Sequence, residues 1–119
     1  MNYDLSDSKI TDKNVKLLGQ CYTLNLSNCK QITDESVKIL GQCHKLDVSW
    51  CDKITDLSMK LLGQCHTIDL CGCHQITDES VKELKNLHML YICNCYIKKQ
   101  SAIIAELETY GCIIKMYNY

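Results

Sequence analysis

Cysteine side chains recur in this chain at a fixed interval, and thiols at regular spacing could form disulfides or bind metal ions. The chain has ten cysteines in 119 residues. Cysteines that recur once per repeat, however, usually behave as small apolar residues that fill one slot. We therefore predict that the two cysteine rows are reduced and buried. One row comprises Cys21, Cys43 and Cys65, and the other comprises Cys29, Cys51, Cys73 and Cys95.

Histidines form a third row with the same interval. His44, His66 and His88 occupy one position of successive repeats, so stacked repeats would place them about 4.8 Å apart, the spacing of neighbouring strands. Closely spaced imidazoles can hold a metal ion or respond to pH, because each protonated ring repels the next. The other interpretation, which we favour, is a solvated row inherited through duplication.

Two further cysteines, Cys71 and Cys93, lie outside the two cysteine rows. We expect them on neighbouring strands with their side chains pointing outwards, at a Cα separation that a disulfide would allow. Parallel neighbours point the same way and would strain that bond, so we expect free thiols. A metal- or redox-responsive module that uses exposed Cys and His rows is therefore an alternative function.

The interval shared by these rows is 22 residues, and most of the sequence repeats with it. Ile-Thr-Asp begins at residues 10, 32, 54 and 76, and Leu-Gly-Gln-Cys begins at residues 18, 40 and 62. Such a period indicates a solenoid, in which each unit packs against its neighbours. A solenoid offers a binding surface rather than an active-site pocket.

Each repeat reads as a short strand followed by a short helix. Leu24 and Leu26 alternate with polar residues, which predicts a strand whose leucines point into the core. Thr33 and Asp34 are good N-cap candidates for a helix of about two turns. Glycines come just after the helices, where a left-handed residue is favoured; they are Gly19, Gly41 and Gly63.

The terminal units depart from the repeat. The Ile-Thr-Asp signature is lost at residues 98–100, and a longer helix at about 101–109 and a final strand at 112–117 are expected. In total we predict six parallel strands and five helices in a single domain over residues 1–119. Nothing in the sequence covers the first unit, so we expect either a homodimer through residues 1–18 or fraying there.

This pattern resembles the leucine-rich repeat, specifically the cysteine-containing subtype of F-box adaptor proteins. The segment from Leu24 to Asp34 matches the family motif L-x-L-x-x-C-x-x-I-T-D. The resemblance implies an α/β leucine-rich repeat solenoid, a horseshoe with one parallel sheet on the concave face and short helices on the convex face. It also implies a protein-protein interaction module, related to the substrate-recognition adaptors of ubiquitin ligases. The F-box itself is absent from this sequence.

In that family the outward strand positions line the concave face, where partners usually bind. Trp50 is the only tryptophan, and Gly72 on the next repeat leaves room for its indole ring. The ring is either an exposed anchor for a partner or is folded back over Gly72 for packing. Carried over by register, the resemblance predicts a partner site at Lys45, Asp47, Trp50, Asp69, Cys71, Tyr91 and Cys93.

Charge, hydropathy and the absence of catalytic motifs argue against several classes of protein function. The formal net charge is -1 and the 13 basic residues are scattered lysines, so the basic stripe required for nucleic acid is missing. No apolar run approaches the roughly 18 residues that span a bilayer, and we expect a cytoplasmic or nuclear protein with no membrane partner. No catalytic triad, phosphate loop or cofactor motif occurs. We therefore expect a protein-binding module that is not an enzyme and has no cofactor.

Overall fold

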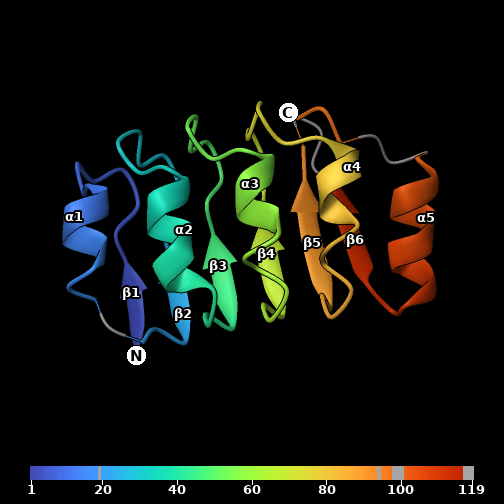
Figure 1. The fold of residues 1–119 in the computed structure, drawn as a ribbon, viewed down its shortest axis with the longest axis horizontal. Helices are drawn as coiled ribbons and strands as arrows, with labels where there is room; N and C mark the ends of the chain where they lie inside the picture. Colours follow the sequence, from blue (N-terminus) through green and yellow to red (C-terminus); the bar gives the residue numbers. More distant parts are fainter. Residues whose placement is uncertain (19, 94, 98–100, 117–119) are drawn as a thin grey trace.

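The computed structural model describes residues 1–18, 20–93, 95–97 and 101–116, and within them strands alternate with helices. These residues form five helices and six strands, and Figure 1 shows the helices in a row in front of the sheet. The predicted number and order of elements are confirmed. The strands are β1 (Asn2–Asp4), β2 (Thr23–Asn25), β3 (Lys45–Asp47), β4 (Thr67–Asp69), β5 (Met89–Ile92) and β6 (Ile113–Met116). The helices are α1 (Asp12–Val15), α2 (Asp34–Leu40), α3 (Asp56–Met59), α4 (Asp78–Val81) and α5 (Ala102–Thr109).

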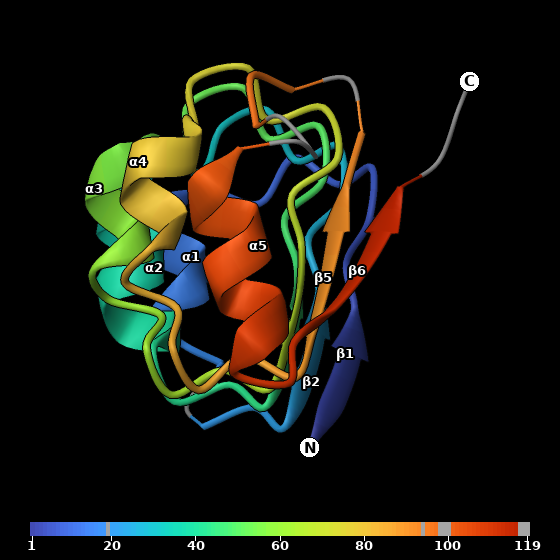
Figure 2. The ribbon, with the colours of Figure 1, turned by 90° about the vertical axis from the view of Figure 1, so that its right-hand side faces the viewer.

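The sheet is parallel throughout, and its strands lie in sequence order from β1 to β6. Figure 2 shows the helices on one face of the sheet only. The opposite face, which we call the strand face, corresponds to the predicted concave face. This two-layer arrangement of parallel strands and short helices is the predicted solenoid.

The core lies between the two layers and is built from register-matched apolar side chains. Leu24, Leu46, Ile68 and Leu90 are successive partners across β2 to β5, and none is more than 1% exposed. Because side chains of a strand alternate between faces, the intervening residues point to the strand face. The same alternation therefore builds both the core and the candidate site.

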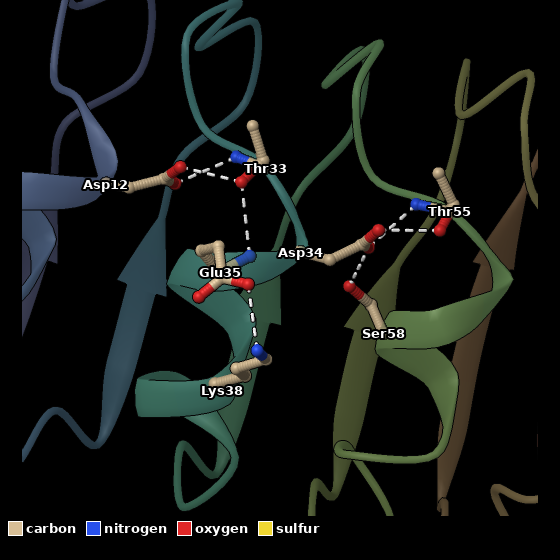
Figure 3. Close-up of polar contacts among 7 residues, drawn as sticks. All are labelled: Asp12, Thr33, Asp34, Glu35, Lys38, Thr55 and Ser58. Atoms are coloured by element: carbon tan, nitrogen blue, oxygen red, sulfur yellow. Dashed lines mark hydrogen bonds and ion pairs between the residues drawn. The ribbon is translucent and has the colours of Figure 1, made fainter.

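Each threonine of the Ile-Thr-Asp signature is the N-cap of its helix, as predicted. The aspartate that follows has a role that the local pattern did not indicate. Asp34 accepts hydrogen bonds from the backbone nitrogen of Thr55 (2.9 Å), from the Thr55 hydroxyl (2.6 Å) and from the Ser58 hydroxyl. Figure 3 shows this carboxylate reaching from one helix to the next. Asp12 and Asp56 bind the next repeat in the same way.

Thr11, the N-cap of the first helix, donates to Asn14 rather than to an aspartate of another repeat. The Asn14 Oδ1 atom accepts hydrogen bonds from the Thr11 nitrogen (3.3 Å) and the Thr11 hydroxyl (2.9 Å). Asn14 occupies the position that Ser36 and Ser58 hold in later repeats. A capping box thus satisfies locally the donors that an aspartate satisfies elsewhere.

The two cysteine rows are buried as predicted, with Cys95 half-buried, and the described thiols are free. The thiols of the second row also form hydrogen bonds. The Sγ atoms of Cys29, Cys51 and Cys73 donate to the backbone oxygens of Leu5, Leu26 and Val48, each at 3.1 Å. Every such bond joins a repeat to the preceding one, which is why a weakly polar side chain fills this slot.

The glycine after α2 does not adopt the expected left-handed conformation. Gly41 has φ −60° and ψ −15°, which any residue could adopt. A Cβ atom there would lie 2.7 Å from the backbone oxygen of Leu61, so close approach of the next repeat requires glycine instead. Gly19, residues 98–100 and Tyr117 lie outside the described residues.

Candidate protein-binding surface on the strand face

A shallow hollow of about 220 Å³ lies on the strand face over β3, β4 and β5. Four of the predicted site residues border it, and their positions follow from strand alternation and register. Asp47, Asp69 and Tyr91 are successive register partners. The lining consists of Lys45, Leu46, Asp47, Thr67, Asp69 and Tyr91.

Two carboxylates share the centre of this surface. Asp47 accepts hydrogen bonds from the Ser49 nitrogen (2.9 Å) and hydroxyl (2.6 Å), and Asp69 accepts one from the Cys71 nitrogen (2.9 Å). Burial, with a further contribution from the charge of Asp47, raises the pKa of Asp69, although hydrogen bonding to Cys71 opposes the shift. Negative charge at Asp69 is thus held at an energetic cost in the isolated chain.

Cys71 and Cys93 are placed side by side at the end of the strands, but they are not exposed. Each is 3% exposed, which corrects the expectation of accessible outward thiols. Burial raises the pKa of the Cys71 thiol, and hydrogen-bonding contacts with Cys93 and Asp69 raise it further. A neutral buried thiol is a poor nucleophile. The redox-responsive alternative therefore loses its exposed thiols.

Trp50 adopts the packed alternative rather than the fully exposed one. Its ring lies flat on Gly72, where a Cβ atom would fall 2.3 Å from the indole Cδ2 atom. The ring of His74 meets the indole edge-on at 5.9 Å between centroids. The indole remains half-buried, so part of it still faces solvent beside the hollow.

The backbone at Trp50 is left-handed, with φ 60°. Asp7, Asn28 and Gly72 occupy the equivalent turn positions with φ 59°, 59° and 74°, and Asp, Asn and Gly are the residues that tolerate this conformation. Tryptophan does not, and the cost is roughly 1–2 kcal/mol. Hydrogen bonds that join the Trp50 backbone to Cys71 (2.8 Å) and to the Lys30 ammonium group (2.7 Å) help to hold it. The residue types in this slot were the signal that sequence reasoning missed.

The predicted histidine row is present and is one ring longer than expected. Tyr22, His44, His66 and His88 stack with centroid separations of 4.5, 4.4 and 4.6 Å. Rings stacked in this way direct their nitrogens side by side rather than towards one point. Within the described ranges, no group of three or more His, Cys, Asp or Glu side chains could hold a metal ion.

The N-terminal strand belongs to the sheet and packs against the core. β1 pairs with β2, and Tyr3 and Leu5 pack partly buried against the core. Pairing of two chains through residues 1–18 stays a prediction, which sedimentation at several protein concentrations can test.

Among the helices of the described part of the chain, none has the length and apolar character of a membrane span.

Comparisons with known proteins agree with this architecture. Residues 23–41 and 44–63 match the family model described as Leucine Rich repeat. The fold is similar to that of a chain in the crystal structure of the Rad7 and Elc1 complex in yeast, with a TM-score of 0.73 and 15% sequence identity. The similarity covers 93% of this chain and 31% of that chain. A comparison with curated protein sequences finds no significant match. The two matched segments and the similar fold agree with a leucine-rich repeat solenoid architecture.

Proposed function

We propose that this protein is a non-enzymatic interaction module that binds a protein partner on its strand face. The observation that carries the proposal is the hollow over β3 to β5, where polar side chains gather on a rigid sheet. A rigid scaffold reduces the ordering cost of binding. Lys45, Asp47, Asp69 and Tyr91 form the contact surface, and the half-buried Trp50, three residues after Asp47, extends it.

Cys71 and Cys93 have a different part in this proposal from the one expected from the sequence. At 3% exposure each, they offer almost no surface to a partner and do not contact it directly. The proposed partner site therefore consists of the predicted residues whose side chains reach solvent, namely Lys45, Asp47, Trp50, Asp69 and Tyr91.

The charge on this surface favours a partner that presents a basic side chain. Asp47 and Asp69 are neighbours on adjacent strands, and burial raises the pKa of Asp69. A Lys or Arg side chain between the two carboxylates would favour their ionised forms. Lys45 at the border of the hollow would repel a second cation and so restrict the orientation of the partner.

A finer proposal is that the module serves as a substrate-recognition adaptor of the F-box type in the cytoplasm or nucleus. Its support is the cysteine-containing repeat pattern and the similarity of fold to a chain from the Rad7 and Elc1 complex. This chain spans 31% of the length of that chain. An adaptor role would require further segments or subunits that connect the repeats to an enzyme.

Site-specific photo-crosslinking tests the location of the partner site. A photoreactive phenylalanine at Tyr91, in the hollow, should capture a partner from the native cell extract. The same residue at Tyr110, exposed at the end of α5, should not. Equal capture from both positions would contradict the strand face as the site.

Charge reversal tests the chemistry of the same site. The double variant Asp47→Lys/Asp69→Lys should weaken binding of the captured partner by about 100-fold or more, because close charge pairs at interfaces couple strongly. Glu106→Lys/Glu108→Lys makes the same charge change at exposed positions of α5 on the helix layer and should leave binding unchanged. Circular dichroism confirms that each variant is folded. Unchanged affinity in the double variant would rule out the carboxylate pair as the contact.

A further inference from the structure

The row formed by Tyr22, His44, His66 and His88, which we call the ring row, follows the edge of the sheet where the strands begin. Its three stacked contacts have interplanar angles of 6°, 17° and 23°. The backbone repeats the same connection, because His66 donates to the His44 oxygen at 2.9 Å and His88 to the His66 oxygen at 2.8 Å. The ring row therefore joins four consecutive repeats through side chains as well as backbone.

Cationic and neutral groups predominate around the ring row. Lys45 follows His44 in β3, and the amino terminus of Met1 acts on Cys21 and Cys43 in the first repeats. The thiols beside the rings are buried, and burial raises the pKa of Cys43 to about 11 and of Cys65 to about 12. They are therefore neutral at physiological pH.

Carboxylates lie near the C-terminal end of the ring row. The turn that leads to His88 carries Glu83 and Lys85, and Glu108 in α5 acts on Cys112, which directly precedes β6. Burial and then the charges of His44 and His88 lower the pKa of His66, and no carboxylate contributes to that shift. A proton on the central ring thus has little local compensation.

We propose that the ring row is an acid-released clasp, in which neutral imidazoles hold the strand-entry edges of neighbouring repeats together and protonation of adjacent rings separates them. Two imidazolium rings at the observed 4.4 Å separation repel each other and lose their stacking. His66 is the centre of the clasp because it contacts an imidazole on both sides. Its Nδ1 atom also shares a hydrogen bond of 2.9 Å with the Thr67 hydroxyl, which fixes the plane of the ring.

Nuclear magnetic resonance titration of the histidine rings tests the coupling directly. In the wild-type protein the three imidazoles of the ring row should titrate over more than two pH units, because neighbouring sites that interact strongly take up protons in separate steps. His66→Phe keeps a stacked ring but removes the central proton site. In that variant the titration curves of His44 and His88 should differ from those of the wild type, because the ring that contacts both no longer takes up a proton. Unchanged curves for His44 and His88 would overturn the proposal.

Thermal unfolding supplies a second and independent readout. Between about pH 7.5 and about pH 5, the range in which histidines change charge, the wild-type midpoint should fall by several degrees more than that of His66→Phe. His74→Phe makes the same substitution outside the ring row and should follow the wild type. Parallel pH dependence of the wild type and His66→Phe would overturn the clasp. If His66→Phe does not fold, His66→Gln serves as the second variant in both measurements.

Discussion

Aspartates occupy two contrasting places in the repeat. On the helix layer, Asp12, Asp34 and Asp56 each accept three hydrogen bonds from the next repeat. On the strand face, Asp47 and Asp69 accept bonds from residues two positions away in their own repeat. The first group holds repeats together, whereas the second leaves carboxylate oxygens directed at the hollow.

Asp56 and Asp69, one from each group, differ in the direction in which their pKa is shifted. Burial would raise the pKa of Asp56, but hydrogen bonds from Ser80 and Thr77 outweigh it and the pKa is lowered. Burial prevails at Asp69, and the pKa is raised. The balance between hydrogen-bond donors and burial therefore separates a structural carboxylate from one that is available to a partner.

The largest loss of stability should come from a carboxylate introduced where the neighbouring backbone group is a hydrogen-bond acceptor rather than a donor. In Cys51→Asp the new group would lie in the core facing the Leu26 backbone oxygen, to which the thiol now donates. We expect a loss of about 4 kcal/mol or more in the free energy of unfolding, measured by urea denaturation. Cys51→Ser keeps a donor of similar size and should lose much less. A Cys51→Asp protein as stable as the wild type would show that the slot is not interior.

Removal of a structural carboxylate should have the next largest effect. Asp34→Ala leaves the fully buried Ser58 hydroxyl and both Thr55 donors without their acceptor. We expect a loss of about 3 kcal/mol. Asp69→Ala, the matched change on the strand face, should alter stability by less than about 1 kcal/mol. Similar losses in the two variants would remove the distinction between the two groups.

The pH dependence of stability should separate Asp56 from Asp69 by sign. A carboxylate whose pKa is lowered by folding, such as Asp56, stabilises the fold at pH values above its unfolded pKa near 3.8. This stabilisation is lost as the pH falls through its folded pKa. A raised pKa costs stability at neutral pH, and acid relieves the cost. Asp56→Asn should therefore be less stable than the wild type at about pH 7, and Asp69→Asn equally or more stable. Both differences should shrink below about pH 4. Urea midpoints across this range that shift in one direction for both variants would contradict the assignment.

The smallest effect should come from an exposed ion pair on the same helix layer. Lys38 contacts Glu35 at 2.8 Å with both side chains exposed, and Figure 3 shows this pair on α2 beside the cross-repeat contacts of Asp34. Exposed pairs are screened by solvent and add little stability. Lys38→Met should unfold at the wild-type urea concentration. A clear loss would mean that charge on this surface matters as much as the carboxylates bound between repeats.

Parts of this contrast were accessible from the sequence. The alternation of Leu24 and Leu26 predicted the strands, Thr33 predicted a helix start, and the cysteine rows predicted buried slots. The roles of Asp34 and Cys51 were not predicted, because their partners lie 21 to 25 residues away. The ring of Tyr22 was also missed, since it continues the histidine row with a different residue type.

The sequence by itself determined the repeat, the order of strands and helices, and the face on which each side chain lies, because all of these follow from periodicity within about one unit. Only the tertiary structure decided which polar groups meet between units. Stacking turned Asp12, Asp34 and Asp56 into cross-repeat acceptors, covered Cys71 and Cys93, and laid Trp50 on Gly72. Those outcomes depend on the offset between neighbouring repeats, a distance in space that no local pattern encodes.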